Sequence, residues 1–315
     1  MTEDEIRDLP SNRGRWGTDD ELGTLNLITD QVRGRAVAEA RTGRTVSLAR
    51  QVRATPLLAG GVPALPGSPA VYQAMMFTGS PSAAMAEVLV MTPHRPELTH
   101  IDALTHVVYD GQVYPGVPLS ERANPAGASR GSTAIFADGI VTRGVLLDLA
   151  PGGQLAVDHP VTGADLDAAA ERVGVKVQPG DAIVVRGGWN LADLPDNKVP
   201  GMTVDAIRWM HRHDVSLYLG DICDARPHHI PALGSALHRV GIGYMGMPLV
   251  DSADPTELVA VCRETGRGSF MLVVAPQRLD GATGLAVNRW RSSDAPFPAP
   301  LTDATRIPSR HEATV

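Results

Sequence analysis

The apolar positions of this chain follow helical and extended spacings in turn. In the segment 162–173, Leu166, Ala169 and Val173 share one helical face, and Gly174 ends the pattern. Thr29 or Asp30 can cap the first of these segments, Thr162 can cap the second, and a proline opens the last. The predicted helices span 29–42, 162–173, 203–213, and a segment from Asp254-Pro255 through Val261.

Short aliphatic runs between these helices predict strands. The run 144–149 is typical of a buried strand. Proline and glycine are too dense in residues 53–70 for a helix or a central strand, so we expect a long loop there. The predicted strands span 45–52, 87–92, 144–149, 182–186, 215–219 and 269–275.

This alternation of helices and strands predicts a mixed α/β fold. We find no internal repeat and no segment with the composition of a linker, so we expect one domain over residues 1–315. The proline-rich, polar residues 294–315 are interpreted as an extended C-terminal arm or tail.

Composition excludes several classes of protein. The chain has 315 residues, of which 43% are hydrophobic and 20% charged, enough to bury a sizeable core. Its net charge of −7 argues against binding to nucleic acid. Two cysteines cannot form a disulfide scaffold, the first ten residues do not resemble a signal peptide, and no apolar run reaches roughly 18 residues. We therefore expect a cytoplasmic protein that does not cross a membrane.

Three of the ten histidines fall in one short window with an aspartate. His94, His100, Asp102 and His106 follow directly after the predicted strand 87–92. Residues two apart on an extended chain point to the same face, so His100 and Asp102 can reach one divalent cation. Histidine with carboxylate suits zinc, manganese or iron. The alternative is a group of polar surface residues, and the clustering favours a metal site.

The same window resembles the signature of the cyclase family, which includes bacterial kynurenine formamidase, isatin hydrolase and trans-dienelactone hydrolase. Further segments in the same order resemble the longer members of that family, so that the resemblance covers about residues 13–288. The matching segments are THIDALTH at 99–106, RGRWGTDDELGTLN at 13–26, DGQVYPG at 110–116, RGVLLD at 143–148, PGDAIVVRGGW at 179–189 and GATG at 281–284.

The resemblance implies a fold, an activity and a set of site residues. The implied fold is a mixed-sheet, swivelling β/β/α domain, in a homodimer or a higher homo-oligomer. Members are zinc- or manganese-dependent hydrolases, with metal ligands that match His100 and Asp102 and a proton-transfer histidine that matches His106. A further histidine and an acidic residue of the C-terminal half match His238 and Asp251.

Two positions depart from the family pattern. Shorter members have a further histidine four residues before the one that matches His100, and here Pro96 stands in its place. His94 is therefore a candidate, either as a metal ligand or as a substrate contact. The second departure is Asp251, where the shorter members have the longer glutamate, so its direct coordination stays open.

The expected function is hydrolysis of a small cyclic or aryl amide, imide, lactam or lactone by metal-activated water. One alternative keeps the metal but performs cyclisation, dehydration or isomerisation in a biosynthetic pathway. Another is a non-catalytic descendant that binds a ligand. Trp16, Tyr114 and His229 are candidates for substrate contact. Trp16 and Tyr114 can equally serve the core, and the surroundings of His229 favour a polar loop.

Overall fold

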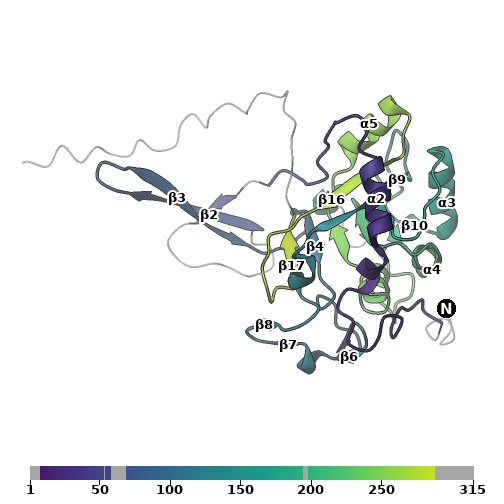
Figure 1. Ribbon diagram of the computed structural model, residues 1–315, viewed down its shortest axis with the longest axis horizontal. Coiled ribbons are helices and arrows are strands. Elements are labelled where there is room, and N and C mark those ends of the chain that lie inside the picture. Colours follow the sequence, from purple (N-terminus) through teal and green to yellow (C-terminus); the bar gives the residue numbers. More distant parts are fainter. Residues whose placement is uncertain (1–7, 53, 58–68, 194–197, 288–315) are drawn as a thin grey trace, which may run out of the picture.

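In the computed structural model, seven strands form a mixed sheet at the centre of the molecule (Figure 1). The structure describes residues 8–52, 54–57, 69–193 and 198–287. Strands β9, β11, β13 and β15 run parallel, whereas β16, β4 and β17 run antiparallel to the strand beside them. In sheet order the strands are β16 (Ser269–Val274), β9 (Ile140–Asp148), β11 (Ala182–Arg186), β13 (Leu217–Gly220), β15 (Leu249–Asp251), β4 (His100–Asp102) and β17 (Gly284–Ala286).

Four α-helices cover the two faces of this sheet. Val32 of α2 and Leu258 of α5 pack in one buried cluster with strand residues. Leu166 of α3 and Trp209 of α4 pack in the other cluster, on the opposite face. The mixed α/β fold predicted from the sequence is therefore confirmed, with helices on both sides of the sheet. The helices are α2 (Asp30–Ala38), α3 (Gly163–Arg172), α4 (Val204–Arg212) and α5 (Thr256–Thr265).

Threonine side chains cap three of these helices, and the caps at Thr29 and Thr162 are those predicted from the sequence. The side chain of Thr29 accepts a hydrogen bond from the backbone of Val32, and Thr203 caps α4 in the same way. Thr162 and Asp165 form a reciprocal capping box at the start of α3. Each cap satisfies a backbone N–H that has no partner inside its helix, which fixes where the helix starts.

One predicted strand, 45–52, is wrong. Within it only Ala49 forms an isolated bridge, to Ala253. The backbone N–H of Arg50 donates instead to the side chain of Thr99, at 2.9 Å. A side chain thus takes the hydrogen bond that a neighbouring strand would have made, and the segment does not join the sheet.

A separate three-stranded sheet extends away from the main body (Figure 1). It is formed by β1 (Thr55–Pro56), β2 (Val71–Thr78) and β3 (Ala84–Met91), in that order. Strand β3 confirms the strand predicted at 87–92, whereas β2 was not predicted. Residues 58–68 of the expected loop and the expected arm at 294–315 lie outside the described residues.

Short elements complete the chain between these layers. The two-residue strands β10, β12 and β14 form a small parallel sheet, and two further pairs form antiparallel ribbons. No helix in the described part of the chain is long and apolar enough to cross a membrane. The remaining elements are β5 (Gln112–Val113), β6 (Val117–Pro118), β7 (Ala123–Asn124), β8 (Gly127–Ala128), β10 (Pro160–Val161), β12 (Gly201–Met202), β14 (Cys223–Asp224), the 3₁₀ turns η1 (Gly23–Leu27), η2 (Leu119–Glu121), η3 (Thr133–Phe136) and η4 (Leu191–Asp193), and the π-helical η5 (Leu237–Ile242).

A buried ion pair joins strand β9 to the turn that precedes β11. Arg143 of β9 donates from Nη1 to the carboxylate of Asp181 at 2.8 Å, and the Asp181 side chain has no solvent exposure. Burial raises the pKa of the Asp181 carboxyl, while a backbone N–H from Gln178 and the Arg143 guanidinium oppose that shift. Arg143 also contacts Glu39 at 3.2 Å, and further arginines pair with the same two carboxylates, Arg35 with Asp181 and Arg267 with Glu39.

We expect Arg143→Met to destabilise the fold by about 3 kcal/mol, because it leaves the buried Asp181 without its closest cation. Urea unfolding measures the change. Arg44→Met is the matched control, since Arg44 pairs with Glu264 in solvent and should cost less than about 1 kcal/mol. Equal effects of the two substitutions would contradict this account.

Candidate metal centre

Two neighbouring strands bring together three of the predicted site residues. In β4, His100 and Asp102 point to one face of the sheet, while Ile101 between them packs into the core of the other face. Strand β15 pairs antiparallel with β4, and its register places Asp251 directly opposite His100. Residues far apart in the sequence therefore share one face because a single strand pair fixes them.

His100 is oriented by a backbone carbonyl. Its Nδ1 lies 2.7 Å from the carbonyl oxygen of Leu98 and donates to it. The other ring nitrogen, Nε2, then carries a lone pair and lies 3.5 Å from Oδ1 of Asp102. This is the usual way in which a protein fixes the tautomer of a metal-binding histidine.

His238 reaches the same place from η5. Its Nδ1 lies 2.5 Å from Oδ2 of Asp224, which accepts the hydrogen bond. Its Nε2 lies 3.5 Å from Oδ2 of Asp102 and 3.1 Å from Oδ2 of Asp251. Asp224 was not predicted from the sequence, and it gives His238 the carboxylate partner that metal-binding histidines commonly have.

The donor atoms of these residues fit a divalent cation. Oδ2 of Asp102 and Oδ1 of Asp251 are buried and have no hydrogen-bond partner among the described residues. Ligands about 2.0–2.2 Å from one centre lie roughly 3–3.6 Å from each other, and the separations around His238 and His100 fall in that range. Two triads that share Asp102 have all their ligand atoms within 4.8 Å of one another and could each hold a metal ion: His94, His100 and Asp102, and Asp102, His106 and His238. Asp251 belongs to neither triad, although its Oδ2 lies 3.1 Å from Nε2 of His238.

The electrostatics of the cluster favour positive charge. Burial by itself would raise the pKa of the Asp102 carboxyl, but hydrogen bonds and charges from the surrounding histidines hold it well below its usual range. Burial would likewise lower the pKa of His238, yet the carboxylates of Asp224 and Asp251 raise it well above its ordinary value. The carboxylates thus stabilise a cation at the position where His238 and Asp102 meet.

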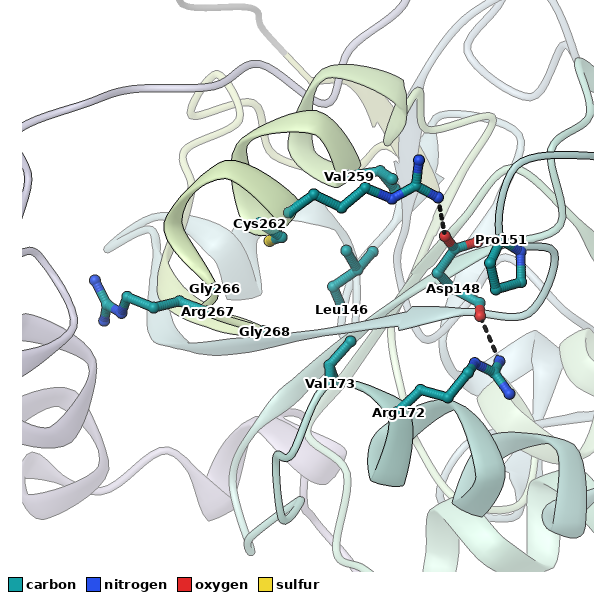
Figure 2. Close-up of a pocket in the computed structure, with 11 residues that line it drawn as sticks. Leu146, Asp148, Pro151, Arg172, Val173, Val259, Cys262, Gly266, Arg267 and Gly268 are labelled. Carbon is teal, nitrogen blue, oxygen red and sulfur yellow. Dashed lines mark hydrogen bonds and ion pairs between the residues drawn. The ribbon is translucent and has the colours of Figure 1, made fainter.

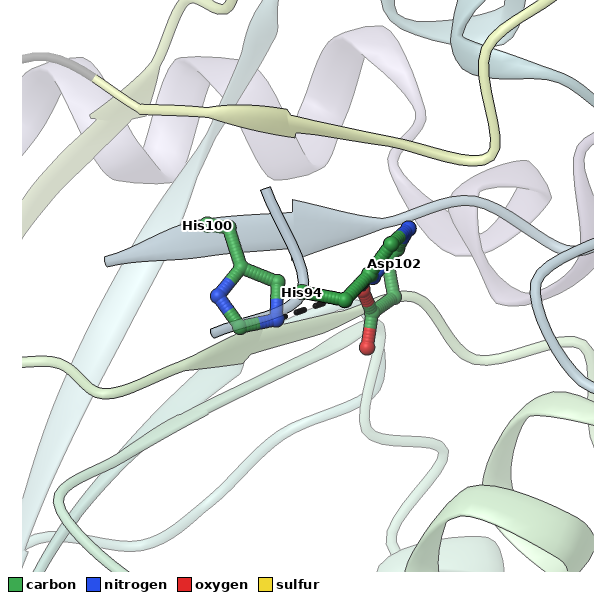
Figure 3. A group of neighbouring side chains, drawn as sticks. All are labelled: His94, His100 and Asp102. Atoms are coloured by element: carbon green, nitrogen blue, oxygen red, sulfur yellow. Dashed lines mark hydrogen bonds and ion pairs between the residues drawn. The ribbon is translucent and has the colours of Figure 1, made fainter. Parts of the chain in front are cut away.

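His94 lies in the cluster with both of its ring nitrogens engaged. Nδ1 is 2.8 Å from Oδ1 of Asp102, and Nε2 is 3.1 Å from the hydroxyl of Thr283 (Figure 3 shows His94, His100 and Asp102). A Cβ atom at Gly284 would lie 2.4 Å from Cε1 of His94, so only glycine leaves room for the ring. His94 belongs with His100 and Asp102 to one group whose ligand atoms lie within 4.8 Å of one another, so it is placed to bind a metal beside Asp102.

His106 lies beside Asp102 and against His94. Its ring is stacked on that of His94 at a centroid distance of 3.7 Å, and its Nε2 lies 3.9 Å from Oδ2 of Asp102. Burial lowers the pKa of His106 to about 4, with Asp102 opposing the shift and the neighbouring imidazoles adding to it. The ring is therefore neutral at pH 7 and has a lone pair that can accept a proton.

These side chains open into a cavity of about 530 Å³. That volume is in the range of small-molecule sites. The residues that line the cavity include His94, His100, His106, His238 and Asp251 among the predicted ones, and Arg95, Asp224, Arg226 and Arg239 among those not predicted.

The predicted substrate contacts are not among the residues that line this cavity. Tyr114 is 3% exposed, packs in the core, and donates from its hydroxyl to Asp20 at 2.9 Å. The ring of Trp16 lies beside the guanidinium of Arg15, and His229 is exposed. A sequence pattern does not distinguish an aromatic residue of a pocket from one of the core.

A second cavity, of about 340 Å³, lies between α5 and the end of β9 (Figure 2). Its floor is apolar, with Leu146 and Val259, and Arg172 and Arg263 both donate to Asp148. The two arginines stand in or beside the last turns of α3 and α5, where a cation is stabilised by the helix dipole. None of the predicted site residues lines this cavity.

Comparisons with known proteins agree on the kind of fold. Residues 47–225 match the model of a family described as "Putative cyclase". A crystal structure of a novel cyclase is similar with a TM-score of 0.76 and 26% identity, over 90% of this chain and 97% of that chain. No curated protein sequence matches this chain.

Two isatin hydrolases share the fold at lower identity. Isatin hydrolase A from Labrenzia aggregata, bound to benzyl benzoate, has a TM-score of 0.55 and 18% identity, over 81% of this chain and 96% of that chain. Isatin hydrolase A from Ralstonia solanacearum has a TM-score of 0.53 and 18% identity, over 83% of this chain and 96% of that chain.

We expect Asp102→Asn to abolish stoichiometric binding of zinc or manganese, because the amide has neither the charge nor the second acceptor oxygen of the carboxylate. Elemental analysis of the purified chain, after equilibration with each metal, measures the content. His211→Ala removes a histidine outside the cavity and should leave the metal content unchanged. Retention of one metal per chain by Asp102→Asn would contradict the assignment.

A smaller loss of metal binding is expected for Asp224→Asn. This variant keeps every donor that faces the cation but removes the carboxylate that orients His238, which typically lowers metal affinity about 10–100-fold. Competition with a chromogenic chelator measures the affinity. An affinity equal to that of the wild type would show that Asp224 does not position His238.

Proposed function

The chain belongs to the cyclase family, and from this premise we propose that it is a metal-dependent hydrolase. Its substrate would be a small cyclic or aryl amide, imide, lactam or lactone. The observation that carries the proposal is Oδ2 of Asp102, which is buried without a hydrogen-bond partner among the described residues and lies near His238 and His106, two histidines that line the cavity. The isatin hydrolases, which share the fold, are named for hydrolysis of a cyclic amide, which supports this substrate class.

The proposed metal ligands are His100, Asp102, His238 and Asp251. When bound, zinc or manganese would supply a Lewis acid for the substrate carbonyl and lower the pKa of bound water to about 7. Leu98 holds His100 and Asp224 holds His238 through their Nδ1 atoms, so that both Nε2 atoms stay directed at Asp102.

The proposed proton-transfer residue is His106. Its neutral ring can accept a proton from the attacking water at pH 7 and return it to the leaving nitrogen or oxygen. His94 stacks on this ring and bonds to Asp102, so it holds His106 in place beside the metal ligands. Since hydrolysis needs both an acceptor and a donor of protons, one histidine in this position can serve both steps.

Removal of the His106 imidazole tests the proposal directly. We expect His106→Ala to keep its bound metal and to lose about 10²–10⁴-fold in kcat on any lactam, lactone or aryl formamide that the wild type opens. Absorbance or pH-stat assays over a panel of such compounds measure the rate.

His211→Ala is the control for loss of a histidine outside the cavity, and it should retain the wild-type rate. Near-normal turnover by His106→Ala would contradict the assigned role. A metal-loaded wild type that opens none of these compounds would contradict the proposed hydrolase activity.

A further inference from the structure

The cavity between α5 and the end of β9, which we call the α5 cavity, has no part in the proposed function. It shares no lining residue with the cavity of the metal centre. Leu146 and Val259 from its floor pack in the same cluster as Ile101 of β4. The metal-site residues on either side of Ile101 point to the opposite face of the sheet. A ligand in the α5 cavity would therefore leave the metal centre untouched.

The α5 cavity is cationic, although the chain as a whole has a net charge of −7. Its charged lining residues are three arginines and one aspartate. One of the arginines, Arg267, pairs with Glu39. The aspartate, Asp148, lies 2.8 Å from the guanidinium of Arg186, which compensates its charge. The other two arginines of the lining therefore give the cavity a surplus of positive charge.

These two arginines, Arg172 and Arg263, have no acidic partner on their own helices. The positions three and four residues before each of them, which would lie beside it on the helix surface, are alanine or valine. Arg172 forms no ion pair with a described residue, and the side chain of Arg263 is 58% exposed. The dipole at a helix C-terminus corresponds to roughly half an elementary charge, so it does not neutralise a guanidinium.

Asp148 fixes both guanidinium groups beside the cavity. Its backbone carbonyl accepts a hydrogen bond from Nη2 of Arg172 at 2.7 Å (Figure 2). Oδ2 of its side chain accepts from Nη2 of Arg263 at 3.4 Å. One residue thus brings two cations from different helices to the same place, and an anion that binds there loses little free energy in ordering them.

The floor below these cations is apolar. Leu146, Val173 and Val259 line the cavity, and its volume is about 340 Å³. That volume lies at the lower end of the range for small-molecule sites, roughly 300–1,000 Å³. An apolar floor with positive charge at one side suits a small molecule that has an apolar body and one anionic end.

We propose that the α5 cavity binds a small organic carboxylate. The carboxylate lies between Arg172 and Arg263, and the apolar body packs on Leu146, Val173 and Val259. A planar carboxylate matches the paired N–H groups of a guanidinium. Hydrolysis of an amide or a lactone releases a molecule of the same chemical class, but the proposal does not rest on that reaction.

Isothermal titration calorimetry of the metal-loaded full chain with benzoate tests the proposal. We expect saturable binding of one benzoate per chain. Benzyl alcohol keeps the ring without the charge, and inorganic phosphate keeps charge without an apolar body. Each should bind at least about tenfold more weakly than benzoate, because each loses one of the two contributions.

Substitutions locate the binding. Arg172→Met with Arg263→Met should lower the affinity for benzoate at least about tenfold, since both charge-assisted hydrogen bonds are lost. Arg263→Glu alone should have the same direction of effect, and it changes an exposed side chain that the fold does not depend on. The matched control is Arg208→Met, which removes an arginine of α4 that lines neither cavity and should bind benzoate like the wild type.

Asp102→Asn separates this site from the metal centre, and it should also bind benzoate like the wild type. Loss of binding in Asp102→Asn would place the carboxylate at the metal centre and overturn the proposal. A wild type without saturable binding, or one that binds benzyl alcohol or phosphate as tightly as benzoate, would also overturn it. So would wild-type affinity in the variants of Arg172 and Arg263.

Discussion

The carboxylate of Asp102 is the charge around which the site is organised. Its side chain has no solvent exposure, and an ion removed from water in this way must be compensated by nearby positive charge or by a bound cation. His94, His100, His106 and His238 all approach it, from a strand, two loops and a π-helical turn. The arrangement of the four histidine rings follows from this one requirement, since each ring is turned so that a nitrogen faces the carboxylate of Asp102.

Much of the fold could be predicted because its signals are local. A capping threonine and an apolar helical face are properties of adjacent residues, and Thr29 and Thr162 cap their helices as the sequence predicts. The spacing of His100 and Asp102 is also local, because alternation along a strand holds wherever that strand lies. The resemblance to a family added His238 and Asp251, which spacing alone could not connect to this strand.

The remaining features depend on contacts between distant segments. Asp224 supports His238 only because β14 and η5 meet, and no pattern around Asp224 indicates it. Thr283 and Gly284 shape the site because they lie against the ring of His94. Tyr114 lies in the core, where its hydroxyl donates to Asp20, a residue far away in the sequence. Such pairings are decided by the arrangement of the sheet, which the sequence determines as a whole and not segment by segment.

The position of β4 has a consequence for the order in which the chain can fold. Both of its partners, β15 and β17, are made long after it, and β17 is the last strand in the described part of the chain. During synthesis, His100 and Asp102 therefore emerge with no strand on either side of them. The long chain segments that separate β4 from β15 and β17 close into loops slowly. The parallel strands β9, β11 and β13 can pair earlier, whereas the metal centre is assembled only after η5 and β15, which carry His238 and Asp251, have been made.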